Sequence, residues 1–211
     1  MGQHLRFAIR GRIVDAGAAG PREAGGTAIA SIEEYRRMSR EERLGRLTRT
    51  YDELAAATVG RDDAVLSRRP GTGNWAAKEV LCHLRDIEEI FILRFYMMLG
   101  TEEPVFLVLG ELPPEAERWG IRDPLGMPLD PDRWAEERQY LRNDTGAALA
   151  AFGKRRQESL LVLRRLTAEQ WRRGSVHVTL GRMTFDDWIA LIAAHDDRHL
   201  AQLARALAGE P

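Results

Sequence analysis

Two histidines four residues apart are the first candidates for chemistry in this sequence. His195 and His199 fall within a predicted helix over residues 184–208, where a spacing of four places both side chains on one face. At about 100° per residue, the same face carries the apolar side chains of that helix, including Phe185, Trp188, Ile192, Leu203 and Ala206. An imidazole in such surroundings costs about 1–3 kcal/mol for each unsatisfied nitrogen. The pair therefore predicts partners for these nitrogens: a metal ion or, in the simpler alternative, main-chain carbonyls and neighbouring acids.

A third imidazole comes from a second predicted helix, over residues 75–99. His83 lies on the flank of its apolar stripe, about 13 Å from the start of that helix, and the His195 and His199 pair lies about 16–22 Å from the start of its own. Both levels are near the middle of a bundle whichever way the two helices run, so a three-histidine site is geometrically allowed. Neutral imidazoles suit Zn²⁺, Ni²⁺ or Fe²⁺, and three protein ligands leave coordination positions open for catalysis.

The elements that must hold these residues are predicted to be four long helices. Ser39 with Glu42 and Thr184 with Asp187 have the spacing of a capping box, in which two side chains satisfy free amides at a helix start. Asn74 and Asp130 are the predicted caps of the helices between them. The helices are predicted over residues 39–58, 75–99, 131–166, which Gly146 and Gly153 could interrupt, and 184–208.

The segments around these helices differ in composition. Residues 1–30 are rich in glycine and alanine without a sustained period, which predicts a flexible tail before a single domain over residues 31–211. Residues 100–131 hold six of the nine prolines, so we expect a long crossover between the second and third long helices. A short capped turn at residues 167–170 and an extended stretch at 176–180 precede the last helix. No strand-turn-strand pattern competes with an all-α four-helix bundle.

The composition excludes several classes of partner. Thirty-one basic and 32 acidic residues give a formal net charge of -1, which offers no electrostatic attraction to nucleic acid. The longest apolar stretch, residues 90–99, contains Arg94 and is too short to span a membrane. A single cysteine cannot form an internal disulfide, so the chain suits a reducing compartment and we expect a cytoplasmic protein.

Each histidine-bearing helix also carries a recognisable motif. Residues 74–84 read Asn-Trp-Ala-Ala-Lys-Glu-Val-Leu-Cys-His-Leu, residues 183–188 read Met-Thr-Phe-Asp-Asp-Trp, and residues 195–200 read His-Asp-Asp-Arg-His-Leu. Over about residues 39–208 the chain resembles the DinB-like, YfiT-type metal-binding four-helix bundles, a family that includes bacterial thiol-dependent S-transferases. The resemblance implies metal ligation by His83, His195 and His199, an up-down-down-up bundle with a long crossover, and frequent homodimers.

Carboxylates near the histidines are candidates for a supporting role. A ligating histidine usually donates its second N–H to an acceptor. Glu79, one turn before His83, is the leading candidate, with Asp86 and Glu88 behind it, and Asp196 serves the other helix. Either Glu79 or Asp196 could instead be the base that deprotonates a coordinated water or thiol. Glu79 could equally be an ordinary helix-surface residue.

Other reactive side chains are weaker candidates. Cys82 points about 100° away from His83 on the helix and is predicted to be a buried, inert thiol. His177 precedes the last helix and His4 lies in the tail, so we expect both to face solvent.

Three interpretations of function remain open. In the first, a divalent ion activates a low-molecular-weight thiol for attack on a small electrophile, and the resemblance supplies the thiol transfer. The second is a metal-dependent hydrolase, and the third is a non-catalytic, metal-stabilised dimeric bundle. An open coordination position that solvent can reach favours an enzyme, whereas a closed site favours the third interpretation. We expect a small-molecule substrate, a homodimer, and neither nucleic acid nor membrane as partner.

Overall fold

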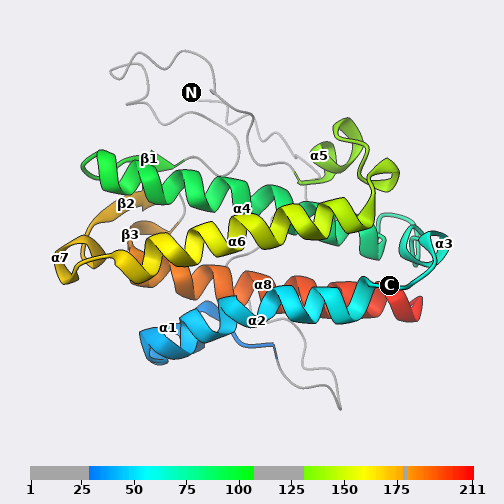
Figure 1. Ribbon diagram of the computed structural model, residues 1–211, viewed down its shortest axis with the longest axis horizontal. Coiled ribbons are helices and arrows are strands. Elements are labelled where there is room, and N and C mark those ends of the chain that lie inside the picture. Colours follow the sequence, from blue (N-terminus) through cyan, green and yellow to red (C-terminus); the bar gives the residue numbers. More distant parts are fainter. Residues whose placement is uncertain (1–28, 107–130, 178–179) are drawn as a thin grey trace, which may run out of the picture.

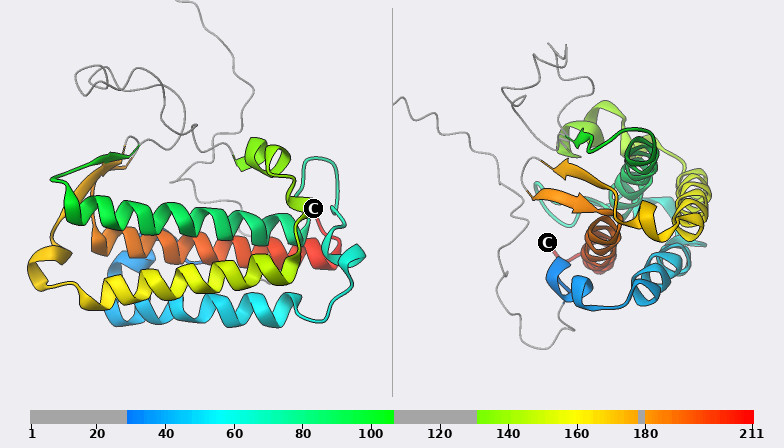
Figure 2. Two further views of the ribbon diagram at one scale, coloured as in Figure 1. Left: turned by 45° about the horizontal axis from the view of Figure 1, so that its top comes forward. Right: turned by 90° about the vertical axis from the view of Figure 1, so that its left-hand side faces the viewer.

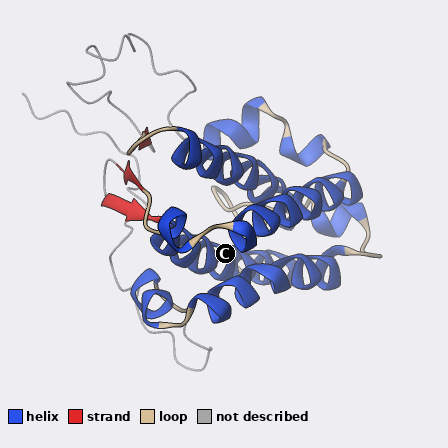
Figure 3. Cartoon of the chain, turned by 60° about the vertical axis from the view of Figure 1, so that its left-hand side comes forward, coloured by secondary structure: helices blue, strands red, loops and turns tan. Residues whose placement is uncertain are grey.

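Four long helices dominate the computed structural model, which describes residues 29–106, 131–177 and 180–211 (Figures 1 and 3). They are α2 (Arg40–Thr58), α4 (Ala77–Gly100), α6 (Thr145–Arg165) and α8 (Phe185–Ala208). Shorter elements connect them: α1 (Ile32–Arg37), α3 (Asp63–Leu66), β1 (Val105–Phe106), α5 (Pro131–Glu137), η2 (Tyr140–Arg142), α7 (Ala168–Trp171), β2 (Gly174–His177) and β3 (Gly181–Thr184). The predicted helical bundle is confirmed. Residues 1–28 of the predicted tail and residues 107–130 of the proline-rich connection, with the predicted cap Asp130, lie outside the described residues.

The contacts between helices define the direction of each. α4 and α8 run in opposite directions, because His83 meets His195 whereas Phe95, further along α4, meets Phe185 at the start of α8. α2 runs in the same direction as α8, and α6 runs parallel to α4 (Figures 1 and 2). The bundle therefore has the predicted up-down-down-up order. α4 and α6 are consecutive long helices and run in the same direction. The connection between them must therefore return along the length of the bundle.

The core lies between the four long helices and combines aliphatic side chains with several large aromatic ones. Its largest fully buried side chains include Trp188, Tyr140, Phe95, Phe152 and Phe185. Burial of one such side chain contributes about 1.5–3 kcal/mol, so these contacts dominate the packing of the bundle. Within the described ranges, no helix is long and apolar enough to cross a membrane.

Local signals in the sequence fix several helix starts. Capping boxes form at four pairs: Ser31 with Glu34, Ser39 with Glu42, Thr167 with Gln170 and Thr184 with Asp187. The start of α4 differs from the prediction, because Ala76 and not Asn74 is its N-cap. The side chain of Glu79 turns back and accepts a hydrogen bond from the Ala76 amide at 2.9 Å. A glutamate at the third helical position thus satisfies that amide without a polar cap residue.

The helix predicted over residues 131–166 is divided into α5, η2 and α6. Gln139 adopts a left-handed conformation with φ of 50°, which ends the helical path. The side-chain amide of Asn143 then donates to the carbonyls of Arg138 at 3.2 Å and Gln139 at 3.0 Å. Asp144 caps α6. The break therefore lies at residues 138–144, just before the expected position at Gly146.

Gly153 does not interrupt α6, contrary to the sequence-based expectation. It is buried, and the ring of Tyr51 from α2 lies directly against it. A Cβ atom at this position would lie only 2.5 Å from Cε2 of Tyr51. The glycine therefore permits close approach of α2 and α6.

A small sheet closes one end of the bundle, where only an extended stretch was predicted. β2 pairs in parallel with β1 and antiparallel with β3, with Val105 opposite Val176 and Gly174 opposite Thr184. This pairing corrects the expectation that His177 faces solvent. His177 is 6% exposed, and its ring lies 5.9 Å from that of Trp188.

His177 should make the folded state sensitive to acid. Burial, aided by the positive charge of Arg94, lowers the pKa of His177 from 6.5 to about 4. Between pH 7 and 5 the unfolded chain therefore takes up a proton at this residue that the folded protein does not, and stability falls as the pH falls. We expect His177→Phe to reduce the loss of unfolding free energy over this range by up to about 2 kcal/mol, measured by urea denaturation of metal-free protein. Identical pH dependence in both proteins would contradict this assignment.

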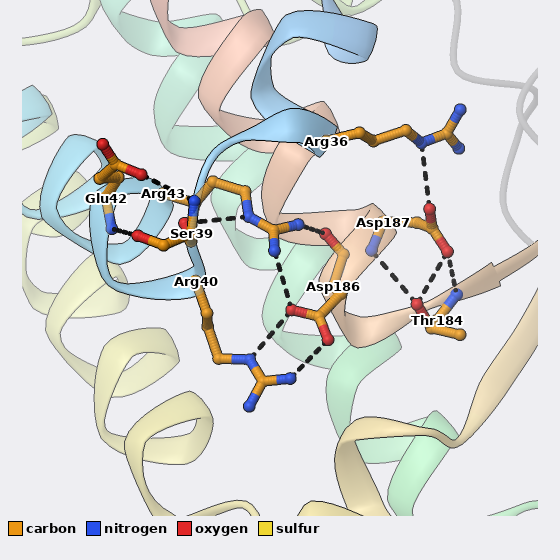
Figure 4. A network of polar contacts seen from close by, with 8 residues as sticks. All are labelled: Arg36, Ser39, Arg40, Glu42, Arg43, Thr184, Asp186 and Asp187. Carbon is orange, nitrogen blue, oxygen red and sulfur yellow. Dashed lines mark hydrogen bonds and ion pairs between the residues drawn. The ribbon is translucent and has the colours of Figure 1, made fainter.

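Ion pairs attach α1 and α2 to the start of α8 (Figure 4). Both Arg40 and Arg43 donate to the Asp186 carboxylate, with Arg40 contributing two bonds of 2.9 and 2.6 Å. Arg36 donates to Asp187 at 3.0 Å, and Asp187 also accepts the Thr184 amide at 2.9 Å. These contacts hold the helix that carries two of the candidate ligands against the N-terminal helices.

Candidate metal centre

The structure brings together the three histidines that the sequence singled out. His83 projects from α4, and His195 and His199 project from successive turns of α8, on the same face of that helix. The Nε2 atoms of His83 and His195 are 3.3 Å apart, and one nitrogen from each of the three rings lies within 4.8 Å of the others. This is the one group of at least three metal-capable side chains found in the described part of the chain.

The spacing of these nitrogens fits a shared cation. Two imidazole nitrogens bound tetrahedrally at about 2.0–2.1 Å from one ion would be about 3.3–3.4 Å apart. The His83 and His195 pair already has this separation. The nitrogen of the third ring, His199, lies within 4.8 Å of the other two, so the set is close enough to serve one ion. The donor set of three imidazoles suits Zn²⁺, Ni²⁺ or Fe²⁺.

The outer nitrogens of the rings have different surroundings. Nδ1 of His199 lies 2.7 Å from Oε1 of Gln202, an acceptor, so Nδ1 carries the hydrogen and Nε2 keeps its lone pair for a ligand. Nδ1 of His83 and of His195 are buried and have no hydrogen-bond partner among the described residues. None of the three rings bonds to a main-chain oxygen in the part of the chain that the structure describes, so the simpler alternative finds no support there.

Burial keeps the three imidazoles neutral. Loss of solvent, together with repulsion from the neighbouring His199, holds the pKa of His83 well below its ordinary value. The same two causes lower the pKa of His195, and burial lowers that of His199 to about 4. At neutral pH all three rings therefore offer lone pairs. His83 is 3% exposed, whereas His195 and His199 are partly exposed residues, so the α8 side of the cluster is the less deeply buried one.

Aromatic rings flank the cluster. The ring of Trp75, just before α4, lies 5.1 Å from that of His83 and 6.5 Å from that of His199. Phe91 meets His195 edge-on at 6.0 Å. Nε1 of Trp75 donates to Asp132 of α5 at 2.9 Å, which fixes the indole ring. An ion bound by the histidines would therefore have mostly apolar walls.

Neither leading carboxylate, Glu79 or Asp196, contacts the histidines, and the candidates behind them, Asp86 and Glu88, pair with arginines instead. Glu79 accepts hydrogen bonds from Nε of Arg69 at 2.8 Å and from the Ala76 amide. Asp196 accepts from Thr50 and Arg156, both at 2.6 Å. Because these partners occupy both carboxylates, the contacts give no support to a role as histidine acceptor or as catalytic base.

Gln202 is the supporting residue that sequence reasoning missed. Its position three residues after His199 was a usable signal, because side chains three apart meet on a helix surface. Cys82 is fully buried as expected, with Sγ 3.9 Å from the Tyr140 carbonyl. Burial raises the pKa of Cys82 to about 11, which keeps it an inert thiol.

The fold and the histidine cluster together define a class: up-down-down-up four-helix bundles with a three-histidine, metal-capable site. The chain belongs to the DinB superfamily, whose family model matches residues 46–203. It is 25% identical over 151 residues to a protein of Bacillus subtilis (strain 168) named "Putative metal-dependent hydrolase YfiT", an alignment that covers 71% of this chain and 74% of that protein.

The same fold occurs in a solved structure described as "YfiT from Bacillus subtilis is a probable metal-dependent hydrolase with an unusual four-helix bundle topology". It superimposes with a TM-score of 0.64 at 22% sequence identity, over 90% of this chain and 92% of that one. At this identity the likeness establishes the fold. What the site does must be argued from its own residues.

Proposed function

We propose that this chain is a metal-dependent enzyme in which His83, His195 and His199 hold a divalent ion, and that it transfers a low-molecular-weight thiol to a small electrophile. The observation that carries the proposal is the convergence of three neutral imidazoles, two of them on partly exposed residues, with no fourth protein ligand among the described residues. A purely structural metal site would instead have a closed set of ligands. When bound, the ion would lower the pKa of a coordinated thiol or water toward neutrality.

The protein residues have separate tasks in this proposal. Gln202 orients His199 through Nδ1, and Trp75 and Phe91 exclude water from the sides of the cluster. In the transfer, a bond forms between sulfur and the electrophilic carbon, the leaving group departs with its bonding electrons, and the thiol proton passes to solvent. A coordinated thiol can lose this proton without a protein base. Loss of the proton without a protein base is consistent with this site, because no carboxylate among the described residues contacts the three histidines.

Hydrolysis is the second candidate, because the matched protein from Bacillus subtilis is named a metal-dependent hydrolase. Three imidazoles can also activate water. The two reactions differ in the nucleophile, so substrate trials distinguish them and a pH profile does not.

The experiment that tests the proposal compares both reactions on one preparation. Purified protein, loaded with Zn²⁺, Ni²⁺ or Fe²⁺, is incubated with cysteine or glutathione and an epoxide or activated aryl halide, and separately with esters and amides without thiol. We expect thiol-dependent turnover that falls at least about a hundredfold in His199→Ala. Ester or amide cleavage without thiol would establish the hydrolase instead. Turnover equal in the wild type and His199→Ala would exclude the site.

The proposal includes a small-molecule substrate, a homodimer and a cytoplasmic location. The family resemblance supports the first and second of these, and the single cysteine supports the third. Light scattering on the purified chain would measure the oligomeric state directly.

A further inference from the structure

A buried ionic cluster occupies the centre of the bundle, beside the histidines. We call it the Arg156 cluster, and it comprises one residue or more from each long helix: Thr50 of α2, Glu88 of α4, Arg156 and Ser159 of α6, and Asp196 of α8. Its three charged side chains are 2%, 3% and 1% exposed for Glu88, Arg156 and Asp196 respectively. A buried charge is tolerated only when it is well paired, so each of these residues is held in place by its partners.

The contacts of the cluster cross the whole bundle. Arg156 donates to both oxygens of Asp196, at 2.6 and 3.2 Å, and its Nη2 atom lies 2.9 Å from Glu88. Thr50 donates to Asp196 at 2.6 Å, and Ser159 donates to Glu88 at 2.6 Å. One guanidinium therefore connects the two helices that carry the histidines, through a carboxylate on each.

The cluster sets the rotation of α8. Asp196 directly follows His195, and successive side chains on a helix differ by about 100° in direction. With Asp196 fixed on Arg156 of α6, His195 and His199 must point toward α4. Glu88 fixes α4 in the same way, five residues after His83. The same guanidinium thus restrains both helices around the point where the three imidazoles meet.

The cluster also carries an excess of negative charge. It holds two carboxylates and one guanidinium, a formal net charge of -1, in an interior where charges are weakly screened. Arg156 by itself disfavours positive charge at His195, and Glu88 and Asp196 compensate for that charge. Removing either carboxylate would leave the guanidinium less compensated and would therefore weaken the binding of a divalent ion to the histidines.

We propose that the Arg156 cluster is a positioning device for the metal centre: Glu88 and Asp196 act through Arg156 to aim the histidines and raise the affinity for the ion, without touching it. The inference rests on the metal site of the proposed function. The alternative is that the cluster only stabilises the bundle.

Neighbouring residues in the sequence provide matched controls. Asp197 is also an aspartate of α8 with ionic partners, but it contacts Tyr35 and Arg46 and lies outside the cluster. Glu89 is also a glutamate of α4, and it pairs with Arg155 on the surface at 2.6 Å. Asp197→Asn and Glu89→Gln remove the same kind of charge from the same helices without altering the cluster.

The test measures metal affinity and geometry in the full chain, with Zn²⁺ by competition against a chromophoric chelator and Co²⁺ by its visible absorption spectrum. Circular dichroism and urea denaturation establish that each variant is folded. We expect Asp196→Asn and Glu88→Gln to bind Zn²⁺ about 10–100-fold more weakly than the wild type and to show an altered Co²⁺ spectrum. Asp197→Asn and Glu89→Gln should match the wild type in both measurements.

Two results would overturn the inference that the Arg156 cluster positions the histidines. Wild-type affinity and spectrum in folded Asp196→Asn and Glu88→Gln would overturn the inference, as would equal losses in the cluster variants and their controls. If the cluster variants do not fold, Thr50→Val and Ser159→Ala remove one hydrogen bond each and keep the charges. These two should then weaken Zn²⁺ binding several-fold, and unchanged binding would overturn the inference. Failure of the wild type to bind any of the metals would instead refute the proposed function.

Discussion

Chelation should lower the melting temperature of the metal-loaded wild type by about 5–10 °C. A ligand that binds only the folded state stabilises it by about 2.7 kcal/mol when present at about 100 times its dissociation constant. For a chain of this length, each kcal/mol corresponds to about 2–4 °C. The three histidines come from helices that meet only in the folded bundle, so the unfolded chain has no equivalent site. Differential scanning fluorimetry with and without EDTA would measure the change.

Two histidine variants test whether the chelator acts through the three-histidine site. His195→Ala lacks one of the three ligands, so its melting temperature should not respond to the chelator. His177→Ala also removes a buried histidine, but one that lies in β2 outside the cluster, and it should respond as the wild type does. Equal shifts in the wild type and His195→Ala would mean that the stabilising ion binds elsewhere.

Arg156→Met should be among the most destabilising single substitutions in the bundle. It leaves Glu88 and Asp196 buried without their shared guanidinium, and breaking a buried ionic network in this way costs about 3–5 kcal/mol. The adjacent Arg155 is the natural control, because its partners Glu89 and Glu158 lie at the surface. Arg155→Met should leave the midpoint of urea denaturation almost unchanged. Similar midpoints for the two variants would show that the buried network does not support the fold.

Much of the fold could be predicted because its signals are local. The capping box at Thr184 and Asp187 and the apolar stripe behind it define α8 within a few residues. The break near Gln139, which separates α5 from α6, could not be predicted in the same way. It depends on a left-handed residue and on the Asn143 side chain bonding to carbonyls that a continuous helix would have used itself. Asparagine offers such bonds in many loops and is no specific signal of a break.

The ligands could be predicted better than the residues around them. The helical positions of His195 and His199 define their face of α8, and helix periodicity alone shows that this face is apolar. Helix periodicity also places Asp196 on the inward side of α8, and this side chain is 1% exposed. Its partner was not apparent, because Arg156 lies 40 residues earlier on a different helix. His177 was misplaced for the same reason, since its burial depends on pairing with the distant strand β1.

The sequence separation within the cluster has a kinetic consequence. His83 and His195 are 112 positions apart, and the second lies on the final helix of the bundle. An intermediate in which α8 has not yet docked keeps His83 apart from the His195 and His199 pair, so it lacks the complete three-imidazole site. We therefore expect a bound ion chiefly to slow unfolding and to change the rate of folding little.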